Sequence, residues 1–348
     1  MTAFLSGYAQ TTANAGPGLP KDPHEVFAAA APFYDFTSPE LKPWHLKATY
    51  QLYDEKGKPS EQGTYEYWWA SPTVYRSTWT RPSATHSEWH MADGGRAHQD
   101  TGESLKFFEY KLQAAFLSPL PTSSEVNPFN SSLDRRITPF GKFKLPCIMV
   151  IPAMPKYEDL KSPPLGLFPT YCFDPQVPAL RANHFFGTMT TEFNQIVKVQ
   201  NKYLAREIVV FDGENKVLSA KVDSIAYLSP GDPTLTPPAD STVAKCDAKC
   251  DKTEISAGVI QGYLLKKVTP YYPERAKELG ISGRVVLQAV IGRDGGIHDL
   301  HVLSSPSPLL AVSALWAVSQ WQYKPYFLLG EPVEVETTAN VIFSLGNR

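Results

Sequence analysis

The sequence predicts an α+β protein of two domains, and three observations carry this prediction. In residues 24–229, apolar and aromatic residues recur in short segments of strand length, with turn residues between them. In residues 255–348, the patterns follow the order helix, strand, strand, helix, strand. Between these regions, residues 230–254 are rich in proline and are predicted to form a linker.

The composition is that of an ordinary globular protein and excludes several classes of function. The 348 residues are 43% hydrophobic and 20% charged, and they suffice for two domains with their own cores. The formal net charge of −2 gives no reason to expect a nucleic-acid partner. No apolar run reaches the roughly 18–20 residues of a membrane span. We therefore expect neither nucleic acid as a partner nor a transmembrane segment.

Residues 1–23 are expected to be either a flexible tail or the remnant of a secretory signal peptide. The segment from Ala3 to Ala9, followed by Gln10, is similar to the end of a signal with a small-residue cleavage site. The basic start and most of the apolar stretch of such a signal are missing. Residues 10–22 are small and polar, which is typical of a disordered segment. A secreted protein would reside in the periplasm.

A β-rich domain is predicted over residues 24–229. A short helix is expected over residues 24–34, and a second helix, Leu105–Leu117, should end before Pro119. Between and after them we expect antiparallel strands at Leu46–Tyr53, Gly63–Trp69, Thr73–Thr80, Thr85–Met91, Phe143–Ile151, Glu192–Val199, Leu204–Phe211 and Lys216–Tyr227. A long polar loop is expected before Phe143.

Aromatic side chains gather on one of these strands. Tyr65, Tyr67 and Trp69 alternate along it and so share one face, with Trp68 on the other. These three rings could line the binding face for a hydrophobic ligand. They could equally form the core, which is the more common role of an aromatic stripe.

The first domain resembles the LolA family of lipoprotein carriers. The resemblance rests on the strand Gly63–Trp69, the pairs Ser71-Pro72 and Tyr75-Arg76, and the two final strands. It implies an open antiparallel half-barrel closed by a helix, whose concave face holds an acyl chain or another hydrophobic ligand. A β-sandwich or a closed barrel is the alternative.

The last region is predicted to be a small sandwich of one sheet and two helices. Pro273 suits the start of a helix, and Gly280 suits its left-handed end. The pair Asp294-Gly295 predicts a hairpin between the strands Val285–Ile291 and Ile297–Val302. A second helix should begin at Ser307 and Pro308, and its core stripe consists of Leu310, Ala314, Ala317, Val318 and Trp321. The final strand is Val333–Phe343.

In order and spacing, this region resembles the C-terminal domain of the TonB family of energy transducers. The resembling pieces are Tyr271-Tyr272-Pro273-Glu274-Arg275-Ala276, Leu279-Gly280-Ile281-Ser282-Gly283, Arg293-Asp294-Gly295-Gly296, Tyr323-Lys324-Pro325 and Gly330-Glu331-Pro332-Val333. The resemblance implies that an extended segment of an outer-membrane receptor, the TonB box, or a segment of another envelope protein adds to the final strand. The partner-binding residues would then be Tyr272, Pro273, Val335, Thr337, Ala339, Val341 and Phe343.

The sequence departs from that family in two respects. Pro270-Tyr271 replaces the glutamine that often precedes the Tyr-Pro pair. The membrane-anchor helix and the long proline-rich spacer of an energy transducer are also missing, so we expect an accessory binding protein rather than an energy transducer. The alternative is a lipid or lipoprotein carrier that uses the hydrophobic face of the first domain.

Four cysteines form two groups, Cys147 with Cys172 and Cys246 with Cys250. Two disulfides in an oxidising compartment would account for them, and four unpaired thiols are the alternative. No further ligands stand near enough in the sequence to indicate structural zinc.

No motif predicts catalysis or a cofactor. His86, Glu88 and His90 alternate on one strand and could form half of a metal site, but a solvated polar face would give the same pattern. The sequence contains neither Gly-x-Ser-x-Gly nor His-Glu-x-x-His. We therefore expect a protein that is not an enzyme and needs no cofactor.

Overall fold

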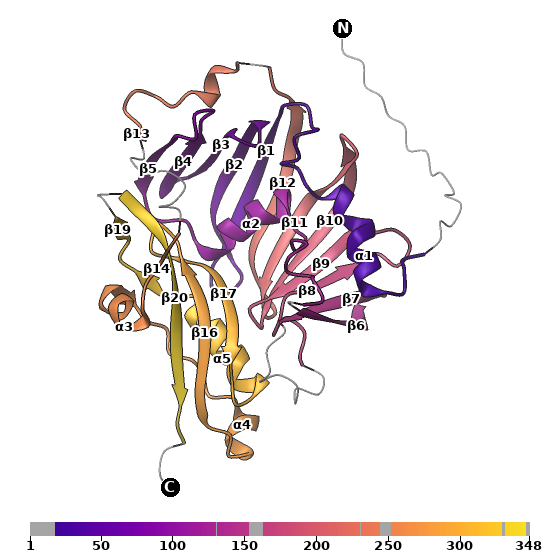
Figure 1. Ribbon diagram of the computed structural model, residues 1–348, viewed down its shortest axis with the longest axis vertical. Helices are drawn as coiled ribbons and strands as arrows, with labels where there is room; N and C mark the ends of the chain where they lie inside the picture. Colours follow the sequence, from indigo (N-terminus) through magenta and orange to yellow (C-terminus); the bar gives the residue numbers. More distant parts are fainter. Residues whose placement is uncertain are drawn as a thin grey trace.

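The structure, a computed structural model, describes residues 18–129, 131–152, 163–229, 231–243, 252–328 and 331–345. These residues form two large β-sheets and one two-stranded sheet, with helices between and beside them (Figure 1). No helix among them is long and apolar enough to span a membrane. The mostly antiparallel, two-part architecture agrees with the predicted fold class.

The first sheet is open and has thirteen strands in the order β13-β5-β4-β3-β2-β1-β12-β11-β10-β9-β8-β7-β6. Its strands are β1 (Trp44–Tyr53), β2 (Pro59–Ser71), β3 (Val74–Arg81), β4 (Ala84–His90), β5 (Arg96–Gly102), β6 (Ser131–Phe140), β7 (Phe143–Pro152), β8 (Thr170–Phe173), β9 (Leu180–Phe185), β10 (Met189–Val199), β11 (Lys202–Asp212), β12 (Asn215–Tyr227) and β13 (Thr242–Val243). Neighbouring strands are antiparallel throughout, and β1 joins the two halves by pairing with both β2 and β12.

Two helices accompany this sheet, as predicted. Helix α1 (Pro23–Ala30) starts after Asp22, whose carboxylate accepts hydrogen bonds from the amides of His24 and Glu25. Helix α2 (Phe107–Leu117) ends two residues before Pro119. Leu112 and Phe116 of α2 are buried against the sheet, which fixes the helix on the face that carries Tyr65.

Strands β5, β6, β8 and β9 were not predicted, and the expected polar loop before Phe143 contains β6. Its sequence is polar because β6 forms one edge of the sheet, where side chains remain partly exposed. Strand β8 is only four residues long and lies among prolines, which hides its pattern.

The second sheet has the order β14-β20-β16-β17, with β19 paired to the start of β20. Its strands are β14 (Lys252–Glu254), β16 (Gly283–Ile291), β17 (Ile297–Ser304), β19 (Tyr326–Leu328) and β20 (Glu331–Phe343). Helices α3 (Ala257–Ile260), α4 (Glu274–Glu278) and α5 (Pro308–Val318) accompany it, together with the small pair β15 (Leu264–Lys266) and β18 (Gln322–Tyr323). The predicted order of elements is confirmed.

The predicted helix boundaries in this region hold to within a residue. Ser307 caps α5, because its hydroxyl accepts a hydrogen bond from the amide of Leu309 at 3.2 Å. Pro273 is the residue before α4 rather than its first residue. Gly280 follows α4 with a φ of 66°, the left-handed conformation expected of a helix-ending glycine.

Most of the predicted linker that the structure describes is packed against the two sheets. Residues 231–243 lie on the first sheet, where the Thr234 carbonyl accepts hydrogen bonds from Arg76 and from the Trp89 indole. Strand β13 then pairs with β5, and β14 pairs with β20. The two sheets therefore each gain a strand from this segment.

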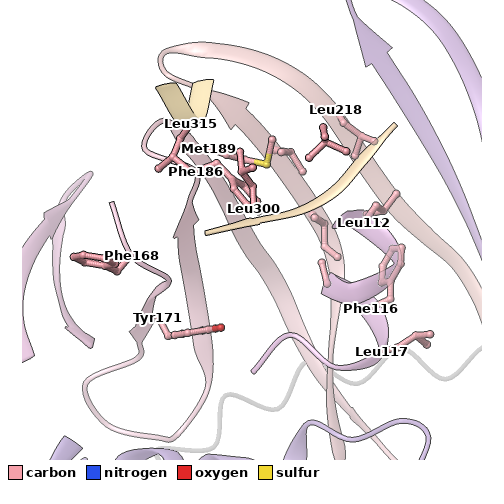
Figure 2. Packing of buried hydrophobic residues seen from close by; sticks show 14 of the residues in the cluster. Leu112, Phe116, Leu117, Phe168, Tyr171, Phe186, Met189, Leu218, Leu300 and Leu315 are labelled. Atoms are coloured by element: carbon pink, nitrogen blue, oxygen red, sulfur yellow. The ribbon is translucent and has the colours of Figure 1, made fainter. Parts of the chain in front are cut away.

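One hydrophobic core runs through both parts of the molecule. Phe168 and Phe186 of the first part and Leu300 and Leu315 of the second belong to the same buried cluster. Figure 2 shows Phe186 beside Leu300 and Leu315, with α2 nearby. Helix α5 is buried on almost all sides as a result, because its own sheet covers one side and the first part of the chain covers another.

Candidate strand-binding edge and domain interface

The outer edge of β20, on the side away from β16, is covered by β14 along residues 334–336 and is open along the second half of the strand. Strand β19 pairs with residues 331–333 at the start of β20. On the inner side, β16 pairs with residues 335–343. Within the described parts of the chain, no strand pairs with the outer side of residues 337–343.

The backbone groups that point to this open edge belong to alternate residues. Glu336 marks the outward set, since its carbonyl accepts a hydrogen bond from the Ile255 amide at 2.9 Å. By the alternation of an antiparallel ladder, Thr338, Asn340 and Ile342 also direct their N–H and C=O groups outward. An edge of this kind is a template for another strand.

The five residues of β20 that the sequence predicts to bind a partner belong to the other alternating set, which faces inward. The side chains of Val335, Thr337, Ala339, Val341 and Phe343 are all buried, with exposed fractions of at most 6%. Their backbone groups point toward β16. These five residues therefore hold β20 in place through their buried side chains and their pairing with β16. The backbone groups of the alternate residues form the open edge.

The Tyr-Pro pair lies at the end of the same strand. The ring of Tyr272 packs edge-on against Phe343 with centroids 5.4 Å apart, and its hydroxyl donates a hydrogen bond to the Ile281 carbonyl at 2.7 Å. Pro273 follows as the cap of α4. The structure thus brings the two predicted segments of the binding site together.

The other edge of the second sheet, β17, faces α2 of the first part. Three carboxylates lie at this interface, and each one contacts a histidine of its own part and a cation or hydroxyl of the other part. The three sets are Asp294 with His298 and Tyr110, Asp299 with His301 and Lys111, and Glu88 with His90 and Arg293.

The distances in these sets are those of hydrogen bonds and ion pairs. The Asp294 carboxylate lies 3.1 Å from His298 Nε2, and the His298 ring lies 3.8 Å from the Tyr110 ring. The Asp299 carboxylate lies 3.0 Å from His301 and 3.7 Å from Lys111.

The charged forms of these carboxylates are favoured. Burial acts against ionisation, but hydrogen bonds from His298 and Tyr110 hold the pKa of Asp294 below its usual range. The hydrogen bond from His301 and the charge of Lys111 likewise outweigh burial and hold the pKa of Asp299 well below its usual range. Burial lowers the pKa of Lys111.

The candidate ligand face is buried. Tyr65, Tyr67 and Trp69 are at most 2% exposed, and Tyr65 stacks on Phe116 of α2. A cavity of about 120 Å³ lies elsewhere, between α2 and strands β8 to β10. Its lining includes Lys111 and Asn183, and the buried side-chain oxygen of Asn183 has no hydrogen-bond partner among the described residues.

The residues of the candidate metal half-site contact other groups. His86 hydrogen-bonds with Asp100 at 3.0 Å and with the Glu103 carbonyl at 2.6 Å. Glu88 binds His90 and Arg293. In the part of the chain that the structure describes, no three His, Cys, Asp or Glu side chains gather to hold a metal ion.

Cys147 and Cys172 form a disulfide between β7 and β8, where they face each other across the ladder. Cys246 and Cys250 lie outside the described residues, so their predicted pairing remains a prediction.

The interface residues Asp294, Asp299, Lys111 and Arg293 were not predicted to be functional. One sequence signal could have indicated them: residues 308–318 contain no charged side chain, and a helix that is apolar on all sides is buried on all sides. That signal predicts a second layer over α5. It does not predict which segment supplies the layer.

Comparison with known proteins identifies the second part of the chain. Residues 268–345 match the family of the Gram-negative bacterial TonB protein C-terminal domain. The chain is 33% identical over 85 residues to the protein TonB of Pseudomonas aeruginosa, which is 24% of this chain and 25% of that protein. The chain thus spans about a quarter of the length of this curated relative.

Two solved structures are similar to parts of this chain. The solution structure of the C-terminal domain of P. aeruginosa TonB is 32% identical, covers 24% of this chain and 87% of that chain, and has a TM-score of 0.22. A LolA superfamily protein from Nitrosomonas europaea is 7% identical, covers 62% of this chain and 97% of that chain, and has a TM-score of 0.37. The second part is a small domain of one sheet with helices beside it. Within it, residues 268–345 match the TonB-type C-terminal domain.

Proposed function

We propose that this protein is an envelope protein that binds a partner by adding an extended partner segment to the open edge of β20. The observation that carries the proposal is the row of outward backbone groups at Thr338, Asn340 and Ile342. Main-chain hydrogen bonds from such an edge supply affinity, and side chains of the added strand supply register. The partner would be a TonB-dependent outer-membrane receptor or another envelope protein.

Two observations support a periplasmic location. Residues 268–345 match a domain of Gram-negative TonB proteins. The disulfide between Cys147 and Cys172 is the kind of bond that forms and persists in oxidising compartments such as the periplasm. A secreted accessory protein of envelope transport accounts for both.

The proposed activity is binding and not catalysis. The clustered ionisable groups at the interface pair with one another across the two parts of the chain, which is a structural use of charge. None of the catalytic sequence motifs that we sought is present.

A lipid carrier is the second candidate, and the cavity beside α2 is the feature of the described structure that bears on it. At about 120 Å³, that cavity has room for a few water molecules and not for an acyl chain. Tyr65, Tyr67 and Trp69 are packed in the core. A carrier function would therefore require the parts of the molecule to move apart.

The test is the affinity of the full chain for fluorescent TonB-box peptides derived from receptors, measured by anisotropy. Asn340→Pro removes one outward N–H while leaving the β16 side of the ladder, and we expect it to weaken binding at least about tenfold, or about 1.4 kcal/mol. Asn340→Ala keeps the amide and should bind as the wild type does. If no peptide binds at millimolar concentration, or if Asn340→Pro binds equally well, strand addition at β20 is wrong.

A further inference from the structure

The two sheets meet through a contact that contains no strand pairing. Among the described residues, no strand of the thirteen-stranded sheet pairs with a strand of the second sheet. The contact consists of α2 and the β9–β10 turn on one side, and of α5, β17 and the turn at 292–296 on the other. Each sheet therefore keeps its hydrogen-bonded ladder whether or not the contact forms.

The centre of this contact is apolar and its border is polar. Phe186 meets Leu300 and Leu315 at the centre, as Figure 2 shows. Asp294, Asp299 and Glu88 lie around it, with their partners from the opposite part. Charged and polar groups at the border of a contact are typical of domains that move relative to each other.

Lys111 connects the contact to the cavity. Its ammonium group lies 3.7 Å from Asp299 of the second part, and its side chain lines the cavity beside Asn183. Phe185 lines the same cavity and also the small gap in which Leu300 and Leu315 lie. Separation of the two parts would thus expose the apolar centre together with Lys111 and Phe185.

We propose that the TonB-type domain is a lid on the thirteen-stranded sheet, held closed by the three carboxylate-centred contacts, and that its opening gives access to the face that carries Lys111, Phe185 and Phe186. The open edge of β20 lies on the opposite side of the second sheet from β17. The lid therefore does not depend on partner capture at β20 and can be tested without a partner.

A side chain introduced at a glycine of the contact would push the two parts apart locally. Gly187, in the β9–β10 turn, has a φ of 78°, and a Cβ atom built there would lie 2.9 Å from Cγ1 and 3.2 Å from Cα of Val312 in α5. Gly213, in the β11–β12 turn, has a φ of 61° and nothing within 4 Å of the same position. Gly187→Asn and Gly213→Asn thus strain the backbone alike, but only the first pushes against the lid.

The experiment is hydrogen–deuterium exchange of the full chain, together with the fluorescence of the apolar dye ANS. For Gly187→Asn we expect exchange to become about tenfold faster in α2, α5 and β17, with unchanged protection in β1, β2 and β16, and increased dye fluorescence. Gly213→Asn should match the wild type in both measurements.

A second pair of variants tests the polar border. Arg293→Glu places a like charge beside Glu88, whereas Arg284→Glu makes the same change at an exposed site of the same domain. Only Arg293→Glu should open the lid. Unchanged exchange in both contact variants would overturn the proposal, and so would a simultaneous loss of protection in β1, β2 and β16, because the two parts would then unfold as one body.

Discussion

At the scale of single residues, the least expected feature is a buried charge network under α2. The side chain of Arg81 is 1% exposed and that of Glu109 is 0% exposed, and they lie 3.4 Å apart. Tyr50 donates a hydrogen bond to Glu109 at 2.8 Å, and Arg81 also binds Glu61 and the Ser104 carbonyl. Buried charges persist only when such partners surround them.

Glu109→Ala should therefore be strongly destabilising. It leaves Arg81 without its only fully buried carboxylate and Tyr50 without an acceptor, so we expect a loss of about 3–5 kcal/mol in the free energy of unfolding, measured in urea. Glu103→Ala is the matched control, because Glu103 also pairs with Arg81 but its side chain is 67% exposed. It should cost less than about 1 kcal/mol, and equal effects would contradict this account.

A second residue-scale prediction concerns pH. Although burial opposes it, hydrogen bonds from His86 and His98 lower the pKa of Asp100 to about 2. Burial also opposes charge on His86, but Asp100 and the Glu103 carbonyl raise the pKa of His86. The contribution of ionised Asp100 to the free energy of unfolding is present above about pH 4 and is lost as the pH falls toward 2. The His86 contribution is present below about pH 6.5 and lost as the pH rises through its raised pKa.

The difference in unfolding free energy between wild type and Asp100→Asn should thus be largest between about pH 4 and 6.5 and smaller on both sides. Because the Asp100 side chain is 47% exposed, we expect at most about 1 kcal/mol. Urea unfolding across this pH range measures it, with Glu55→Gln in an exposed turn as the control. A difference that does not vary with pH would contradict the pairing.

At the scale of elements, the neighbours of a strand determine whether its edge is open or paired, as β20 and β7 illustrate. The second half of β20 keeps an open edge because β14 covers only residues 334–336 on that side. Strand β7 is instead joined to the short strand β8 by the Cys147–Cys172 disulfide, 25 residues apart in the sequence. A four-residue strand has few ladder hydrogen bonds, so a covalent link adds to its stability.

Replacing both cysteines with serine in Cys147→Ser/Cys172→Ser should lower the unfolding free energy by about 3 kcal/mol, because the unfolded chain regains the entropy of the open loop. Equilibrium unfolding in urea measures the change. Addition of a thiol reductant to the wild type should reproduce it. If neither the double variant nor the reductant changes stability, the disulfide does not constrain the chain in solution.

At the scale of the whole molecule, the shared core joins two parts that the sequence presents as separate domains. Leu300 and Leu315 complete the core of the first part, and α5 is covered from both sides. The two edges of the second sheet therefore differ: the second half of β20 has no strand on its outer side among the described residues, whereas β17 contacts the first part through side chains such as Asp299 with Lys111.

Because the core is continuous, the wild type should unfold in a single calorimetric transition. Gly187→Asn should divide that transition in two, since the side chain introduced beside Val312 separates the parts without breaking either sheet. Differential scanning calorimetry tests this directly. Two well-separated transitions in the wild type would show that the contact contributes little to stability.

Local patterns were sufficient to predict α4, α5, β16, β17 and β20 of the second domain, but not α3, β14, β15, β18 or β19. Pro273, Gly280, Asp294-Gly295 and Ser307-Pro308 determine helix ends and a turn through their own backbone preferences, and the structure confirms those ends to within a residue. The ordered set of these pieces also predicted the TonB-type domain that the family comparison shows.

The sequence predicts that β20 is a strand, but it does not predict which of its backbone groups lie at an open edge. Alternation predicted which residues of Val335–Phe343 share a face. Which of them turn their backbone groups outward depends on the pairing with β16 and on the position of β14, and both are contacts between segments far apart in the chain.

The sequence by itself thus determined the mostly antiparallel β character of the fold, the positions of most helices and strands, and the similarity of residues 268–345 to TonB proteins, because these depend on local preferences and residue order. Only the tertiary structure decided that Tyr65, Tyr67 and Trp69 are core, that the proline-rich segment supplies β13 and β14, and that Lys111 meets Asp299. The physical reason is that burial, edge exposure and charge pairing belong to pairs of distant segments, and no local pattern specifies which segments meet.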